Sequence, residues 1–173
     1  MDLLELLKQS GGQSSLGGLA SGLGLSSSKA NDLVGALGPA LLQGFKKQVE
    51  PKGGLSALQG ALQGGNHERY LDDANLMSAA DSVTDGNKIL GHLFGSKDVS
   101  RNVAAHAAES TGIDASLIKK ALPLLAGLVM GAMSKNTNKG KSLESSLPGL
   151  LGGLGGDDGF GLDDVLGLAK KLF

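Results

Sequence analysis

Residues 111–135 decide the fold of this chain and read TGIDASLIKKALPLLAGLVMGAMSK. Asp114 stands where a helix N-cap is expected, because a short carboxylate can accept hydrogen bonds from the free amides of a first helical turn. An uncharged apolar run, Ala121–Met133, follows it and contains Pro123. A membrane-spanning helix needs about 20 apolar residues, and this run is shorter. We therefore expect a buried central helix that ends near Ser134.

The segment before this helix shows further helical patterns. Asp73 is expected to cap a helix over 74–83. An apolar stripe that ends at Gly95 then has the spacing of one helix face, formed by Ile89, Leu90, Leu93 and Phe94. The next helix is expected to begin with Asp98 as its N-cap and to end at Gly112. That glycine should adopt the left-handed conformation that commonly terminates helices.

The pattern in the first half of the chain predicts helices over 2–9, 13–22, 27–49 and 55–63, separated by glycine-containing turns. Ser26 is expected to cap the helix over 27–49. Pro39 lies inside that helix and is expected to kink it, because proline lacks a backbone donor and clashes with the preceding turn.

Two parts of the chain resemble each other. Gly24-Leu25-Ser26 aligns with Gly112-Ile113-Asp114, and each triplet precedes a long apolar helix that contains a proline. The offset is 112 − 24 = 88 residues at the glycines and 123 − 39 = 84 at the prolines. The difference of four is close to one helical turn of about 3.6 residues, so the buried face is kept. We predict an internal duplication of a helix–Gly–helix unit, with chance alignment of Leu- and Gly-rich helices as the alternative.

These patterns predict an all-α, multihelical bundle. Its first helical repeat covers 1–65, and a second repeat over 66–135 packs with the first as one domain. A flexible Gly/Ser/Lys-rich linker is expected over 136–161, because it combines a polar stretch with a glycine-rich one. A short C-terminal amphipathic helix is expected over 162–173.

Composition narrows the classes of function. Hydrophobic residues make up 40% of the chain but aromatic residues only 3%, so the core must be aliphatic. Cysteine is absent, which excludes disulfides and thiolate sites. The net charge is −1 and no basic stripe is visible, so nucleic acid is a disfavoured partner. A DNA-binding helix-turn-helix at Gly112 is disfavoured too, because the following helix has no Arg, Asn or Gln that could bind base edges.

No catalytic, cofactor or metal site is predicted. His67, His92 and His106 are far apart in sequence, and His106 shares a helix face only with Glu109. A zinc site needs about three or four ligands, so we interpret these as ordinary polar histidines. Residues 152–160 match a calcium-binding nonapeptide only in part and only once, and such sites require stacked copies.

The stretch GNKILGHLFG, residues 86–95, carries a family resemblance together with Thr111-Gly112-Ile113-Asp114 and LPLLAG at 122–127. Tyr70-Leu71-Asp72-Asp73 adds to it. With these motifs the chain resembles the bacterial domain-of-unknown-function family nine-three-seven and is similar to YidB-like proteins. The resemblance implies a multihelical fold, a bacterial source and cytoplasmic localisation. It implies no activity and no catalytic residues.

The C-terminal segment is the main candidate for function. Acidic residues near its start and lysines near its end suit the helix dipole. We expect a non-enzymatic module that binds an unknown protein partner or associates with itself, and a membrane surface is a disfavoured third possibility. The candidate interaction residues fall at helical spacing: Leu162, Val165, Leu166, Leu172 and Phe173.

A different class of function stays open. The chain is alternatively a small-ligand-binding protein or an enzyme with a pocket between the two helical halves. An apolar pocket near Pro39 or Pro123, lined by His92 or His106, would favour that alternative.

Overall fold

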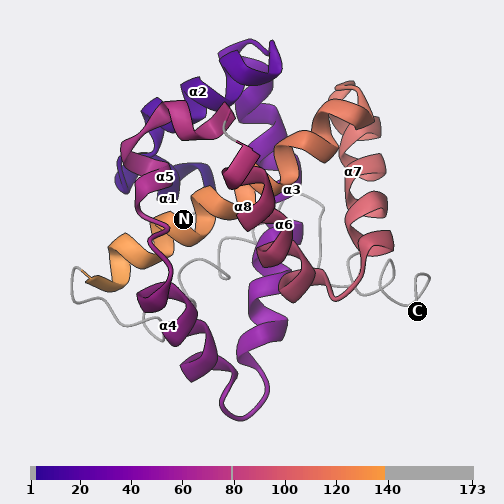
Figure 1. Ribbon diagram of the computed structural model, residues 1–173. Coiled ribbons are helices and arrows are strands. Elements are labelled where there is room, and N and C mark those ends of the chain that lie inside the picture. The colour runs from indigo at the N-terminus through magenta and orange to yellow at the C-terminus, as the bar shows by residue number, and fades with distance from the viewer. Residues whose placement is uncertain (1–2, 79, 139–173) are drawn as a thin grey trace.

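The computed structural model describes residues 3–78 and 80–138, and every regular element in these ranges is helical (Figure 1). The all-α prediction is therefore confirmed. The elements are α1 (Leu3–Gln9), α2 (Gln13–Leu23), α3 (Ser27–Val49), α4 (Gly54–Gly64), α5 (Arg69–Asp72), the 3-10 turn η1 (Ala74–Ser78), α6 (Ala80–Phe94), α7 (Lys97–Thr111) and α8 (Ala115–Asn138).

Helix α8 is the centre of the bundle. It crosses the middle of the molecule in Figure 1, and α1 to α7 all pack against it. Every residue from Ala121 to Ser134 is buried, as expected for a helix that is apolar all round. The prediction of a buried central helix is confirmed.

By length and composition alone, the α8 stretch Ala115–Thr137 is also apolar enough to cross a membrane. In this structure, 78% of the most apolar 18-residue segment of this stretch is buried inside the bundle. Packing against the other helices therefore accounts for its apolar character.

The two helix–Gly–helix corners have the same local structure. Gly24 and Gly112 both have a φ of 67°, in the left-handed region. After each glycine a side chain caps the next helix. Ser26 Oγ accepts a hydrogen bond from the amide of Lys29 at 3.3 Å, and Asp114 Oδ1 accepts one from the amide of Ser116 at 2.7 Å. Both predicted caps are confirmed, while the duplication stays a prediction.

One hydrophobic cluster joins the two halves of the described chain. It includes Leu7, Leu37 and Phe45 from the first half and Leu93 and Leu125 from the second, all at most 5% exposed. Helix α3 contacts α6, α7 and α8 as well as its neighbours in sequence. Its bounds, Ser27 to Val49 with Pro39 inside, are those predicted, while the expected kink at Pro39 stays a prediction.

Three local predictions were wrong. Ser96 caps α7 in place of Asp98, because its hydroxyl accepts from the amide of Val99 at 3.4 Å, whereas Asp98 pairs with Arg101 at 3.0 Å. The expected helix over 74–83 is the turn η1 followed by the start of α6, and α6 continues through Gly86.

The third difference is the end of the central helix. Helix α8 continues to Asn138 and so extends into the expected linker. Most of that linker and the whole expected C-terminal helix, residues 162–173, lie outside the described residues.

Candidate functional site

An open cavity of about 870 Å³ lies between the C-terminal end of α3, helix α4 and helix α6. Its floor consists of buried apolar side chains: Phe45, Leu58, Ile89, Leu93 and Met130. Its rim consists of half-buried and exposed polar side chains: Gln48, Lys52, Asn66, His67, Arg69, Asp85, Lys88 and His92. Residues from both halves of the sequence therefore build one concave site.

The turn between α3 and α4 shapes one wall. Gly53 has a φ of 87°, which reverses the chain after Pro51. A Cβ atom on Gly54 would lie only 2.0 Å from the carbonyl oxygen of Gln48. Glycine is therefore required for α4 to start this close to the end of α3. Gln48 also donates a hydrogen bond to the backbone carbonyl of His92 at 2.5 Å, which ties α3 to α6.

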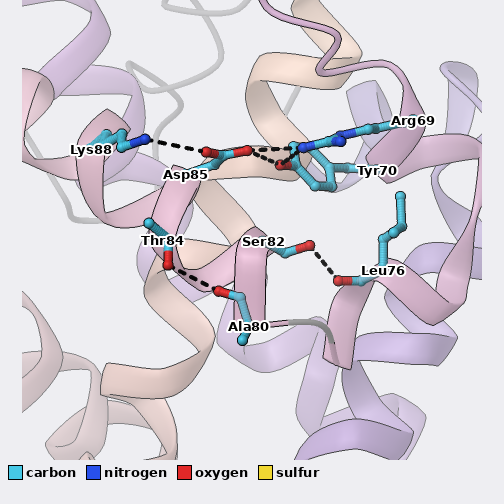
Figure 2. A network of polar contacts seen from close by, with 8 residues as sticks. All are labelled: Arg69, Tyr70, Leu76, Ala80, Ser82, Thr84, Asp85 and Lys88. Atoms are coloured by element: carbon cyan, nitrogen blue, oxygen red, sulfur yellow. Dashed lines mark hydrogen bonds and ion pairs between the residues drawn. The ribbon is translucent and has the colours of Figure 1, made fainter.

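A polar network fixes the opposite wall (Figure 2). The hydroxyl of buried Tyr70 donates to Asp85 Oδ2 at 2.6 Å. Arg69 Nη2 donates to the Tyr70 hydroxyl and to Asp85 Oδ2, both at 2.9 Å. Lys88 Nζ lies 3.7 Å from Asp85 Oδ1. The network joins α5 to α6 and leaves its charged groups at the cavity rim.

The network also determines the ionisation of its members. The hydrogen bond from Tyr70 is the main cause that lowers the pKa of Asp85 below its ordinary value, with smaller contributions from Lys88 and Arg69. Burial is the main cause that raises the pKa of Tyr70. At neutral pH, Asp85 is therefore a carboxylate and Tyr70 a neutral hydrogen-bond donor.

His67 is the half-buried imidazole of the rim. Burial lowers its pKa below the ordinary 6.5, and the Asp85 charge opposes this shift only in part. The backbone of Ala61 also opposes the lowering of this pKa, and the ring centroid of His67 lies 6.4 Å from that of Tyr70. The imidazole is therefore neutral at neutral pH, and it adds no charge to the cavity.

Two of the three histidines considered from the sequence lie at the cavity. His67 and His92 line the cavity, whereas His106 is exposed on α7 away from it. Of the residues named for a possible pocket, His92 lines this cavity, whereas Pro39, Pro123 and His106 do not. Over residues 3–78 and 80–138, no three His, Asp or Glu side chains gather in a way that could hold a metal ion.

Sequence reasoning missed Arg69, Asp85 and Lys88 as site residues. One signal was present, because Asp85, Lys88 and His92 are spaced i, i+3 and i+7 and so share one face of a helix. That polar stripe lies beside the apolar residues Ile89 and Leu93. The candidate interaction residues Leu162, Val165, Leu166, Leu172 and Phe173 lie outside the described residues, so their role stays a prediction.

Fold and site together define an all-α helical bundle with a cavity between its halves. Residues 5–136 match the model of the family described as bacterial protein of unknown function, DUF937. This match covers most of the chain, so the chain belongs to that family and the resemblance to it inferred from the motifs is confirmed. The similarity to YidB-like proteins stays a prediction. No curated protein matches the chain, and no solved structure matches it.

Proposed function

We propose that this protein binds a small, largely apolar molecule in the cavity between α3, α4 and α6. The observation that carries the proposal is the cavity itself, whose volume of about 870 Å³ falls within the roughly 300–1,000 Å³ typical of ligand sites. Such sites combine an apolar lining with a few polar groups that orient the ligand. The floor and the rim of this cavity have that composition.

The packing of the floor and the hydrogen bonds of one wall support the proposal. Phe45 and Leu93 belong to the central hydrophobic cluster and are at most 5% exposed. On the rim, Arg69 and Asp85 are held by each other and by Tyr70. A cavity with fixed walls loses little conformational entropy when a ligand enters, which favours binding.

We favour binding over catalysis because the reactive groups at the rim are held by the protein itself. The Asp85 carboxylate accepts hydrogen bonds from Arg69 and Tyr70, and burial lowers the pKa of His67. Such an environment is typical of groups that shape a binding site and orient its ligand. A carrier or sensor of a small molecule is therefore the function we infer.

A substitution that fills the cavity tests this function. Ala57 is an exposed residue of α4 that lines the cavity, and Ala57→Trp should occupy part of the space without removing a core side chain. We expect the neutral apolar dye Nile red to bind the wild-type chain with increased fluorescence. The variant should lose that binding by about tenfold or more, since a bulky ring excludes the dye.

Ala105→Trp is the matched control, because Ala105 is an exposed alanine on α7 outside the cavity. It should bind the dye like the wild type, and circular dichroism should show equal helix content in all three proteins. Equal dye binding by the wild type and Ala57→Trp would show that this cavity is not the binding site.

Interaction with a protein partner or with a second copy of the chain is a separate proposal. Its support is the helical spacing of the apolar residues within 162–173. Light scattering on the full chain and on a chain that ends at Lys141 would test self-association. Equal masses for the two proteins at one monomer each would contradict it.

A further inference from the structure

The charges around the cavity are unequal. Three cationic side chains line it, namely Lys52, Arg69 and Lys88, against the single carboxylate of Asp85 within the described lining. That carboxylate already interacts with Arg69, Lys88 and the Tyr70 hydroxyl. Among the described residues, the lining of the cavity therefore carries more cationic than anionic side chains.

Lys52 is the cation best placed to meet a ligand. It lies in the turn between α3 and α4 and is exposed. Over the described ranges it makes no ion pair, whereas Arg69 and Lys88 share Asp85. A ligand anion at Lys52 would therefore not compete with an existing salt bridge.

The N-terminus of α4 adds to this positive potential. Gly53 and Gly54 form the start of that helix and border the same cavity, and no side chain caps it. The N-terminal end of a helix carries a partial positive charge, about half an elementary charge, which favours nearby anions. The helix end and Lys52 adjoin in sequence, so their effects on an anion add.

The geometry points to an anionic amphiphile as the ligand, a single apolar chain that ends in a carboxylate. Its head group would lie at the rim beside Lys52, and its apolar chain would lie against Phe45, Leu58 and Leu93. This inference rests on the proposed function, because it names the chemical class of the molecule that enters the same cavity.

A comparison of three amphiphiles with the same apolar chain tests the inference. Dodecanoate, dodecanol and dodecyltrimethylammonium carry a negative, a neutral and a positive head group. Each would be tested for displacement of Nile red from the full chain, the two ionic amphiphiles below their micelle concentrations and dodecanol below its solubility limit. We expect dodecanoate to bind most tightly, and its affinity alone should fall as salt rises, because ions screen the charge interaction.

Two matched variants locate the head group. Lys52→Gln should weaken dodecanoate binding by about tenfold, the effect of losing one charge-assisted hydrogen bond, and should weaken dodecanol binding much less, because dodecanol carries no charge. Lys120→Gln removes another exposed lysine, on α8 and outside the cavity. It should change neither affinity.

The outcomes separate this inference from the proposed function. Equal or tighter binding of dodecanol or of the ammonium compound would overturn the anionic class while leaving a ligand cavity in place. Equal loss of dodecanoate binding in Lys52→Gln and Lys120→Gln would overturn the role of Lys52. Failure of Nile red and of all three amphiphiles to bind would overturn the proposed function and the inference together.

Discussion

At the scale of single residues, Asp85 holds the candidate site together. Its carboxylate receives a hydrogen bond from a tyrosine that is 1% exposed, and it pairs with two cations. Its own side chain is 33% exposed, so solvent screens part of this interaction. The contribution to stability should therefore be moderate, in spite of the several contacts.

Asp85→Asn should lower the free energy of unfolding by about 1 kcal/mol at neutral pH, since it removes the charge from these hydrogen bonds. The pKa of Asp85 is lowered in the folded state from its ordinary 3.8. The stabilisation by Asp85 is thus complete above pH 3.8, and it is lost as the pH falls through the lower pKa that Asp85 has in the folded state. The difference between wild type and variant should shrink over that range in urea unfolding experiments.

Asp98→Asn is the control for this prediction. Asp98 pairs with Arg101 on the exposed surface of α7, at a side-chain exposure of 81%. Its replacement should change stability by less than about 0.5 kcal/mol. If both variants lost the same stability, the network around Tyr70 would have no special role.

At the scale of helices, the crossing of α6 over α8 depends on one glycine. A Cβ atom on Gly86 would lie 1.9 Å from the carbonyl oxygen of Pro123. Backbone atoms cannot move aside as a flexible side chain can, so the two helices approach this closely only because residue 86 has no side chain. Gly131 of α8 is similar, since its Cβ would lie 2.5 Å from the carbonyl oxygen of His67.

Gly86→Ala should destabilise the protein by about 1–3 kcal/mol, because the added methyl group forces α6 away from α8. Gly91→Ala in the same helix is the control, since nothing lies within 4 Å of its Cβ position. Alanine favours a helix over glycine by about 1 kcal/mol, so this control should be neutral or stabilising. Thermal unfolding of the two variants measures the contrast, and equal destabilisation would refute the close contact.

At the scale of the whole molecule, the two halves share one core. Helix α8 belongs to the second half, yet it contacts α1, α2, α3 and α4 of the first. Either half alone would therefore expose a large apolar surface to water, at a cost of roughly 25 cal/mol for each Å².

A chain of residues 1–65 and a chain of residues 66–138 should each lack cooperative unfolding when studied alone. Mixing the two should restore helix content, because the contacts with α8 can form between chains. Circular dichroism of each fragment and of the mixture would measure this. A fragment that unfolds cooperatively alone would indicate two independent domains.

Local structure was predictable from the sequence in most places. The caps Ser26 and Asp114, the left-handed Gly112 and the limits of α3 were all predicted correctly. Each depends on hydrogen bonds and steric contacts within about one helical turn, which neighbouring residues determine. The cap of α7 was predicted wrongly because Ser96 and Asp98 are both good capping residues, and the local pattern does not distinguish between them.

The sequence by itself determined most of the helices, the caps at Ser26 and Asp114, the aliphatic core and the buried character of the central helix. Only the tertiary structure decided the cavity. Tyr70 and Asp85 are 15 residues apart, and Gln48 and His92 are 44 apart, so no local pattern brings either pair together. The angle and distance at which helices pack depend on all the side chains between them, and this packing places the apolar floor and the polar rim around one space.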